Sequence, residues 1–281
     1  RGCMTPTEAK AFLTKEEEQL HDPFMMLDMD NAAYRIIEGI ENGDKIVIYG
    51  DYDVDGVKSV SSLYLYLKEK GADVSYYIPC RLGEGYGVSE AAIRKLHEEG
   101  NNLIITVDTG ITAVTEAELA RQLGMDIIVT DHHECKSELP QAIALVDPHR
   151  KDQPQPVTEM AGVGVAFKLA AAIEGEQETL LDQYCDFLCL GTVADVMPLT
   201  GENRTMVARG LKALENPRRV GIAALMAECS VQKGPVTAGT IGYTLAPRIN
   251  AAGRMGEVGI ATELFLTHDA GRAVELAGAL C

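Results

Sequence analysis

The sequence predicts an α/β protein with an open, mainly parallel sheet flanked by helices, followed by a mostly helical segment. Short apolar runs alternate with helical segments between residues 45 and 147, which is typical of βαβ units. The loop "DPHRKDQPQPVTEM" at 147–160 interrupts this alternation with prolines, so we expect the sheet to end near Val146. Beyond the loop, only helical periodicity continues.

The elements can be placed in order along the chain. Residues 1–45 form an N-terminal helical segment, and the expected strands are "KIVIYG", "DVSYYIP", "NLIITVD", "DIIVTD" and "AIALVD". A helix follows Gly56 and stops at Gly71, and "TEAELARQLG" begins with a capping box of Thr115 and Glu118. Further helices are expected over 162–173, 178–190, 203–215, 220–228, 237–246 and from 260 to the end. We expect a core over 46–200 and a helical continuation over 201–281.

The composition is that of a cytoplasmic globular protein without a membrane segment. Apolar residues make up 46% and charged residues 24% of the 281 residues, and no run approaches the roughly 18 apolar residues of a membrane helix. The seven cysteines contain no C-x-x-C pair, so we expect reduced thiols. A net charge of −17 argues against a broad surface that grips nucleic acid, but not against a nucleic-acid substrate held through metal ions.

Acidic and histidine side chains follow three of the predicted strands. In an open α/β sheet, ligands bind beyond the carboxyl ends of the strands, so these groups can converge at one edge. The residues are Asp51, Asp53 and Asp55 in "YGDYDVDG", Asp108 in "VDTG", and Asp131, His132 and His133 in "DHH". Carboxylates at this density repel one another unless cations compensate them.

Three other interpretations fit parts of this set of residues. The stretch "DYDVDG" fits the start of an EF-hand loop, but the twelfth position is Ser62 where calcium requires a bidentate glutamate. A phosphatase with an aspartate nucleophile would explain one cluster only. An aspartate after a strand is also a common helix cap, yet three such strand ends together favour a metal site.

Oxygen ligands with imidazole and no thiolate suit manganese or magnesium. Several carboxylates can bridge two ions about 3.5 to 4 Å apart, which is the arrangement of two-metal phosphoryl transfer. The residues therefore predict a two-metal phosphoesterase.

The motifs also resemble those of a known family. The stretches "DYDVDG", "VDTG", "DHH" and "TVADVMPL" follow the order of the four motifs of the DHH phosphoesterase superfamily, and the chain is most similar to its single-strand-specific exonucleases. The segments "IPCRLGEGYG", "MAGVGVAFKL" and "LAPRINAAGRM" extend the resemblance from about residue 25 to the end. In several relatives a histidine opens the first motif, at the position of Tyr49 here.

The resemblance implies roles for individual residues. Two manganese or magnesium ions would be held by Asp51, Asp53, Asp55, Asp108, His132 and Asp195. Asp108 would bridge the ions, and the catalytic set would be Asp108, His132 and His133, with His133 facing the scissile phosphate. The substrate would contact Arg81 at its 5′ phosphate end and Arg248, Asn250 and Arg254 along its backbone.

The implied activity is a metal-dependent 5′ to 3′ exonuclease that hydrolyses single-stranded DNA to 5′-mononucleotides in recombination and repair. Two alternatives stay open: a phosphodiesterase for short oligonucleotides or cyclic dinucleotides, and a catalytically silent binding protein that keeps the fold. We expect a monomer, with a single-strand-binding protein or a helicase as candidate partner. We also expect the chain to lead into a DHH-associated domain, whose "GGGH" motif is not found in these residues.

Overall fold

The computed structural model describes residues 4–7, 9–10, 20–80, 85, 87–154, 157–232, 234–255 and 258–281. Its centre is one sheet of parallel strands in the order β2-β1-β3-β4-β5. The strands are β1 (Lys45–Tyr49), β2 (Asp73–Tyr77), β3 (Leu103–Val107), β4 (Asp126–Thr130) and β5 (Ala144–Val146). The open parallel sheet and its end at Val146 confirm the prediction from the sequence.

The strand order creates a switch point between β1 and β3. From β1 the chain moves outward to β2, and it then returns to place β3 on the other side of β1. Tyr49 pairs with Thr106, and Val107 pairs with Thr130, so β1, β3 and β4 end at the same edge. Connections leave such a switch point in opposite directions, which opens a crevice where ligands bind in α/β sheets.

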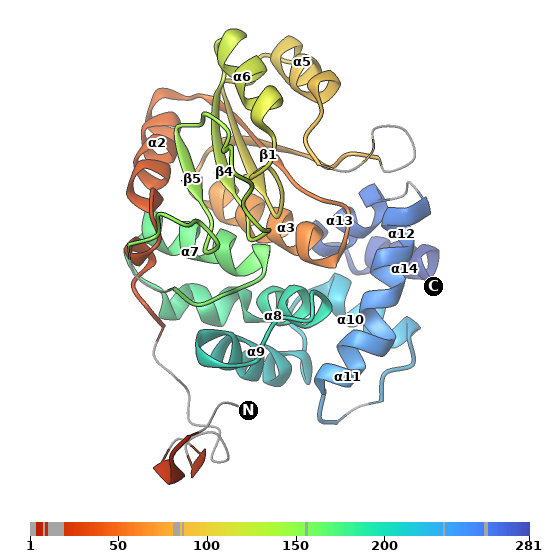
Figure 1. Ribbon diagram of the computed structural model, residues 1–281. Helices are drawn as coiled ribbons and strands as arrows, with labels where there is room; N and C mark the ends of the chain where they lie inside the picture. Colours follow the sequence, from red (N-terminus) through yellow and green to blue (C-terminus); the bar gives the residue numbers. More distant parts are fainter. Residues whose placement is uncertain are drawn as a thin grey trace.

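Helices cover both faces of the sheet (Figure 1). One face carries α5 (Glu90–Glu98) and α6 (Val114–Gln122), which pack against Val47, Ile104 and Val129. The other face carries α2 (Met29–Asn42), α3 (Val54–Glu69) and α7 (Gly162–Glu174), which pack against Ile46 and Ile105. Side chains alternate between the faces of a strand, so strands covered on both sides are apolar throughout.

The C-terminal half is helical. It contains α8 (Glu178–Ala194), α9 (Gly201–Leu214), α10 (Val220–Glu228), α11 (Ala238–Thr240), the π-helical turn η2 (Ile241–Leu245), α12 (Ala246–Met255), α13 (Val258–Leu266) and α14 (Ala270–Leu280). Helix α8 packs on α3, α7 and α9, while α12 and α13 approach α3. Figure 1 shows this half below and beside the sheet, with its last helices next to the start of α3. None of the helices in the described ranges is both long and apolar enough to cross a membrane.

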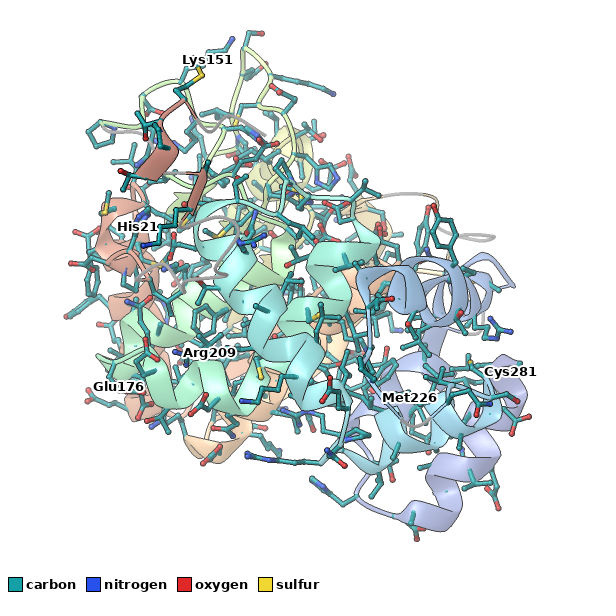
Figure 2. The ribbon with its side chains drawn as sticks, turned by 90° about the horizontal axis from the view of Figure 1, so that it is seen from below. His21, Lys151, Glu176, Arg209, Met226 and Cys281 are labelled. Carbon is teal, nitrogen blue, oxygen red and sulfur yellow. The ribbon has the colours of Figure 1, made fainter. Side chains whose placement is uncertain are left out.

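A buried ion pair ties the N-terminal segment to this half. The ammonium of Lys168 on α7 donates to Glu202 on α9 and to the carbonyl oxygen of His21, 2.7 Å away. The amide of His21 donates to Glu202 Oε2 at 2.8 Å. Figure 2 labels His21 at this junction, far from Met226 on α10 and from Cys281 at the end of α14. The short helix η1 (Pro23–Met25) and α2 then lead into the sheet.

Three details of the predicted helices were wrong. Helix α6 begins at Val114 after Ala113, and the predicted capping box is not formed, because Thr115 bonds to Glu116 and Glu118 bonds to Arg121. The helix expected over 237–246 continues through the π-helical turn to Met255. The segment from 260 to the end is divided between α13 and α14, because Asp269 accepts a hydrogen bond from the Arg272 amide and starts a new helix.

Candidate active site

His132, directly after β4, lies at the centre of a cluster at the sheet edge. Its Nε2 atom is 3.0 Å from Asp108 Oδ1 and 3.7 Å from Asp55 Oδ2, and its Nδ1 atom is 3.8 Å from Asp195 Oδ2. These partners come from the end of β3, the first turn of α3 and the end of α8. Residues far apart in the chain therefore meet beside the switch point.

The cluster contains three overlapping groups with the geometry of a metal site. Within each group the ligand atoms lie within 4.8 Å of one another. The groups are Asp108, His132 and His133; Asp55, His132 and Asp195; and Asp51, Asp53 and Asp108. Every residue predicted as a metal ligand belongs to at least one group, and Asp108 and His132 each belong to two.

Two glycines allow the helices to approach this closely. A Cβ atom on Gly162 would come within 2.6 Å of Asp108 Cβ, and one on Gly191 would come within 2.6 Å of Asp55 Oδ1. Asp108 itself has a φ of 59°, in the left-handed region that is unusual for residues other than glycine. Gly162, the first residue of α7, thus allows this helix to pack closely against Asp108 at the end of β3.

The start of α7 holds the carboxylate of Asp55. The backbone amides of Gly162 and Val163 donate to its Oδ2 and Oδ1 atoms at 2.6 and 3.0 Å. The first amides of a helix have no partner inside the helix and carry partial positive charge, so they stabilise an anion there. Asp53 has the related role of N-cap for α3, accepting from Gly56 N at 2.9 Å.

Burial and mutual repulsion raise the pKa values of most of these carboxyl groups. Burial is the main cause at Asp55 and Asp108, whose pKa values are raised well above the usual range, and neighbouring aspartates add to it. Burial and then Asp53 raise the pKa of Asp51 to about 7 and that of Asp195 to about 6. The carboxylates therefore need positive charge to be ionised together.

The two histidines differ in charge. Burial, followed by the repulsion of His133, lowers the pKa of His132 to about 4, so its imidazole is neutral and can serve as a metal ligand. The hydrogen bond with Asp131, at 2.7 Å, raises the pKa of His133 to about 9, so this ring is an imidazolium at neutral pH. The same Asp131 accepts from the amides of His132 and Ile111. Asp131 thus orients the "DHH" loop, a role that its position after a strand did not reveal.

The donor set fits two hard divalent cations. Asp51 Oδ1 is buried and has no hydrogen-bond partner among the described residues. Carboxylate oxygens with one neutral imidazole match the ligands that manganese and magnesium accept. The unpaired oxygen and the crowded, protonation-prone carboxylates are both explained by cations that belong between them.

The predicted substrate contacts are placed less completely. Arg81 lies outside the described residues, and so does the side chain of Arg254, although its backbone belongs to α12. Asn250 Oδ1 accepts from Val54 N at 3.1 Å and so contacts the first turn of α3 beside Asp53. Arg248 donates to the Thr244 carbonyl at 2.5 Å. Tyr49 donates to the Gly87 carbonyl at 3.0 Å, on the opposite side of the sheet from α3.

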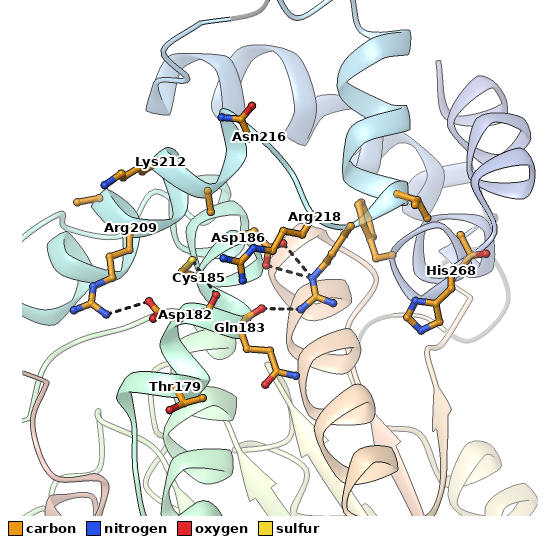
Figure 3. Close-up of a pocket in the computed structure, with 16 residues that line it drawn as sticks. Thr179, Asp182, Gln183, Cys185, Asp186, Arg209, Lys212, Asn216, Arg218 and His268 are labelled. Atoms are coloured by element: carbon orange, nitrogen blue, oxygen red, sulfur yellow. Dashed lines mark hydrogen bonds and ion pairs between the residues drawn. The ribbon is translucent and has the colours of Figure 1, made fainter.

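A separate pocket of about 1180 Å³ lies between α8, α9 and the end of α13 (Figure 3). It contains none of the predicted site residues. Its two carboxylates face arginines, with Asp186 3.1 Å from Arg219 and Asp182 3.4 Å from Arg209. These charges are already paired, so the pocket does not offer a second carboxylate site of the kind found at the sheet edge.

Comparison with known proteins identifies the class of this fold and site. The family model described as "DHH family, N-terminal domain" matches residues 45–192, and the chain belongs to the DHH family. The single-stranded-DNA-specific exonuclease RecJ of Bacillus subtilis (strain 168) is 45% identical over 277 residues, which are 99% of this chain and 35% of that protein. RecJ of Escherichia coli (strain K12) is 34% identical over 90% of this chain and 46% of its own length.

Solved structures agree with the sequence relatives. A crystal structure of exonuclease RecJ bound to manganese has a TM-score of 0.83 and 36% identity, covering 91% of this chain and 65% of that one. RecJ from Thermus thermophilus in complex with Mn²⁺ has a TM-score of 0.79 and 34% identity over 91% of this chain and 37% of that one. The predicted resemblance to the single-strand-specific exonucleases is thereby confirmed. The chain spans less than half the length of the two curated relatives.

Proposed function

We propose that the chain is the catalytic core of a two-metal exonuclease that hydrolyses single-stranded DNA in the 5′ to 3′ direction to 5′-mononucleotides, in recombination and repair. The observation that carries the proposal is the convergence of the three ligand groups at the switch point of the sheet. The names of the relatives support this activity. None of those reported above favours the phosphodiesterase for cyclic dinucleotides or the silent binding protein.

We assign the two ions, Mn²⁺ or Mg²⁺, to Asp51, Asp53, Asp55, Asp108, His132 and Asp195. Asp108 is the best candidate for the bridging ligand, because it belongs to two of the groups and adjoins His132. When bound, such ions activate water and stabilise the charge on the attacking and leaving oxygens of phosphoryl transfer. The protein buries Asp55, Asp108 and His132, and the amides at the start of α7 stabilise the negative charge of Asp55.

His133 is proposed to face the scissile phosphate. Its ring stays protonated at neutral pH because of Asp131, and it is more exposed than His132, with 44% of its side chain accessible. An imidazolium at this place would provide a positive charge and an N–H group that donates a hydrogen bond to a phosphate oxygen.

The remaining assignments concern contacts with the rest of the DNA strand and the organisation of the rest of the protein. Arg81 is proposed to contact the 5′ phosphate, and Arg248, Asn250 and Arg254 the backbone. Residues 46–200 would form the phosphoesterase core, and 201–281 would lead to a DHH-associated domain. A monomeric, cytoplasmic protein with a single-strand-binding protein or helicase as partner stays a prediction.

The activity can be tested with single strands labelled at either end, in the presence of manganese. We expect the 5′-labelled strand to release labelled mononucleotide first, and chelation to abolish the reaction. Asp108→Ala should lower kcat by at least about 100-fold, beyond the 10- to 100-fold typical of losing a group that only orients a ligand. The matched control is Asp182→Ala, because this aspartate on α8 is largely exposed and remote from His132.

Loss of label from the 3′ end first would contradict the proposed polarity. Full activity of Asp108→Ala, or full activity of the wild type in excess chelator, would contradict the two-metal assignment. Preference for a dinucleotide over a long strand would favour the phosphodiesterase instead.

A further inference from the structure

Several helices of the chain end in the same hydrogen-bonded motif. The residue just beyond the helix has a positive φ and donates to a carbonyl three residues back, while the next residue donates to one five residues back. A glycine takes the positive-φ position at four of these ends: Gly43, Gly71, Gly100 and Gly124, with φ values of 73°, 82°, 81° and 78°. Glycine is preferred there because a Cβ atom is disfavoured in the left-handed region.

Among the described residues, two helices end in this way without glycine. At the end of α8, Val196 N donates to Val193 O and Met197 N donates to Thr192 O, both at 3.2 Å. At the end of α10, Ser230 N donates to Ala227 O at 3.0 Å, and the residue after it closes the motif in the same way. The φ values of Val196 and Ser230 are 59° and 53°.

Valine is the more costly of these two residues in that conformation. A β-branched side chain at positive φ is a genuine outlier, whereas small polar residues tolerate it better. Packing inside the molecule does not compensate Val196, because 86% of it is exposed. The neighbouring Met197, by contrast, packs against the apolar core. Contacts within the described structure therefore contribute little stabilisation at the Val196 side chain.

Val196 stands at the candidate metal centre. It directly follows Asp195, whose Oδ2 atom is 3.8 Å from His132 Nδ1. Strained residues cluster at functional sites, and here the strained residue is exposed and directly follows one of the carboxylate residues of the cluster. Ser230 has the same left-handed backbone conformation, but it lies on the loop after α10 and is not adjacent in sequence to any residue of the candidate metal centre.

We propose that Val196 contacts the nucleotide whose phosphate is bound at this centre, through the apolar face of its sugar or base. This inference rests on the proposed nuclease function and deepens it. An isopropyl group cannot bind a phosphate or a metal ion, so the remaining surfaces of a nucleotide are the deoxyribose and the base. Contact with substrate would bury this exposed apolar side chain, and removing apolar surface from water is favourable.

The experiment compares V196G and V196N with S230G in the 281-residue chain. Gly and Asn both accept the left-handed backbone, so each removes the apolar group without disturbing the helix end. We expect both Val196 variants to raise KM for a 5′-phosphorylated single strand by about fivefold or more, with kcat and manganese affinity close to the wild type. S230G places glycine at the equivalent positive-φ position after α10, away from the candidate metal centre, so it should leave KM unchanged. V196G should raise Tm by about 1 to 3 °C.

Two further strands distinguish contact with the base from contact with the sugar, one abasic at the first nucleotide and one abasic at the second, because these two nucleotides flank the scissile phosphate. If a base is contacted, the difference in KM between V196G and the wild type disappears on one of the two strands. If a sugar is contacted, the difference persists on both.

The inference is overturned if the wild type cleaves the strand and both variants have unchanged KM. It is equally overturned if S230G raises KM as much as V196G, because the effect would then come from the helix ends in general. A wild-type chain that neither binds nor cleaves any single strand contradicts the proposed function itself, and this inference with it.

Discussion

At the scale of single residues, the site depends on groups that hold the ligands as much as on the ligands. Asp131 accepts from the amides of Ile111 and His132 and pairs with His133, so it fixes the conformation of the whole "DHH" loop. Both of its carboxylate oxygens accept hydrogen bonds, Oδ1 from the His132 amide and the His133 ring and Oδ2 from the Ile111 amide. Asp131 is therefore a positioning residue, although the sequence placed it among the converging groups without distinguishing its role.

Replacing Asp131 with asparagine should separate positioning from metal binding. We expect D131N to lower kcat about 10- to 100-fold, the usual cost of losing a group that orients a metal ligand, with manganese affinity reduced far less than in Asp108→Ala. Calorimetric titration with manganese and single-turnover kinetics check the two effects separately. Equal loss of manganese binding in D131N and Asp108→Ala would show that Asp131 is itself a ligand.

At the scale of elements, α3 combines the site with an unusual buried charge. Its first turn holds Asp53 and Asp55, and Lys58 follows one turn later with its ammonium buried over the rings of Phe187 and Phe265. The Lys58 ammonium has no hydrogen-bond partner among the described residues. Burial lowers the pKa of Lys58 well below its usual range. A lowered lysine pKa means that folding disfavours the protonated form, which costs stability at neutral pH.

Lys58→Met should therefore stabilise the protein at pH 7 by about 1 to 4 kcal/mol, as seen when buried charges are replaced by apolar groups of similar size. Raising the pH toward the ordinary lysine pKa of about 10.4 removes the charge from the unfolded chain as well. The advantage of the variant should then shrink. Denaturant titrations at pH 7 and pH 9.5 measure both effects.

Lys168→Met is the matched control, because this buried lysine is paired with Glu202. Removing one partner of a buried pair leaves the other charge uncompensated and costs about 3 to 5 kcal/mol. A destabilised Lys58→Met at pH 7 would mean that the Lys58 ammonium stabilises the folded state after all.

The sequence predicted the elements where local patterns decide the structure. The strands β1, β3, β4 and β5 are nearly continuous apolar runs, whereas the edge strand β2 is more polar and only partly buried. The pattern of residue types along the chain predicted each of these strands. The capping box at Thr115 failed because the residues before α6 form a turn in which Ala113 N bonds to Gly110 O, and this starts the helix earlier than a cap at Thr115 would allow. Helix ends depend on such local bonds, which a pattern of residue types does not specify.

At the scale of the whole molecule, the sequence pattern could predict only those residues of the candidate site that directly follow strands. Asp51, Asp53, Asp55, Asp108 and His132 follow strands that share one edge, so topology alone brings them together. Asp195 ends a helix, and only the packing of α8 against α3 and α7 brings it to His132. It was found through the family resemblance. Gly162 and Val196 were not identified as parts of the site, because their importance lies in close approach and in backbone conformation.

The central claim is that these side chains hold a pair of divalent cations, and diffraction from crystals grown with manganese tests it most directly. The account predicts two anomalous peaks about 3.5 to 4 Å apart, between Asp108, His132 and the carboxylates of the β1–α3 loop. A map without peaks at this edge of the sheet, with the same carboxylates bonded only to protein or water, would contradict it.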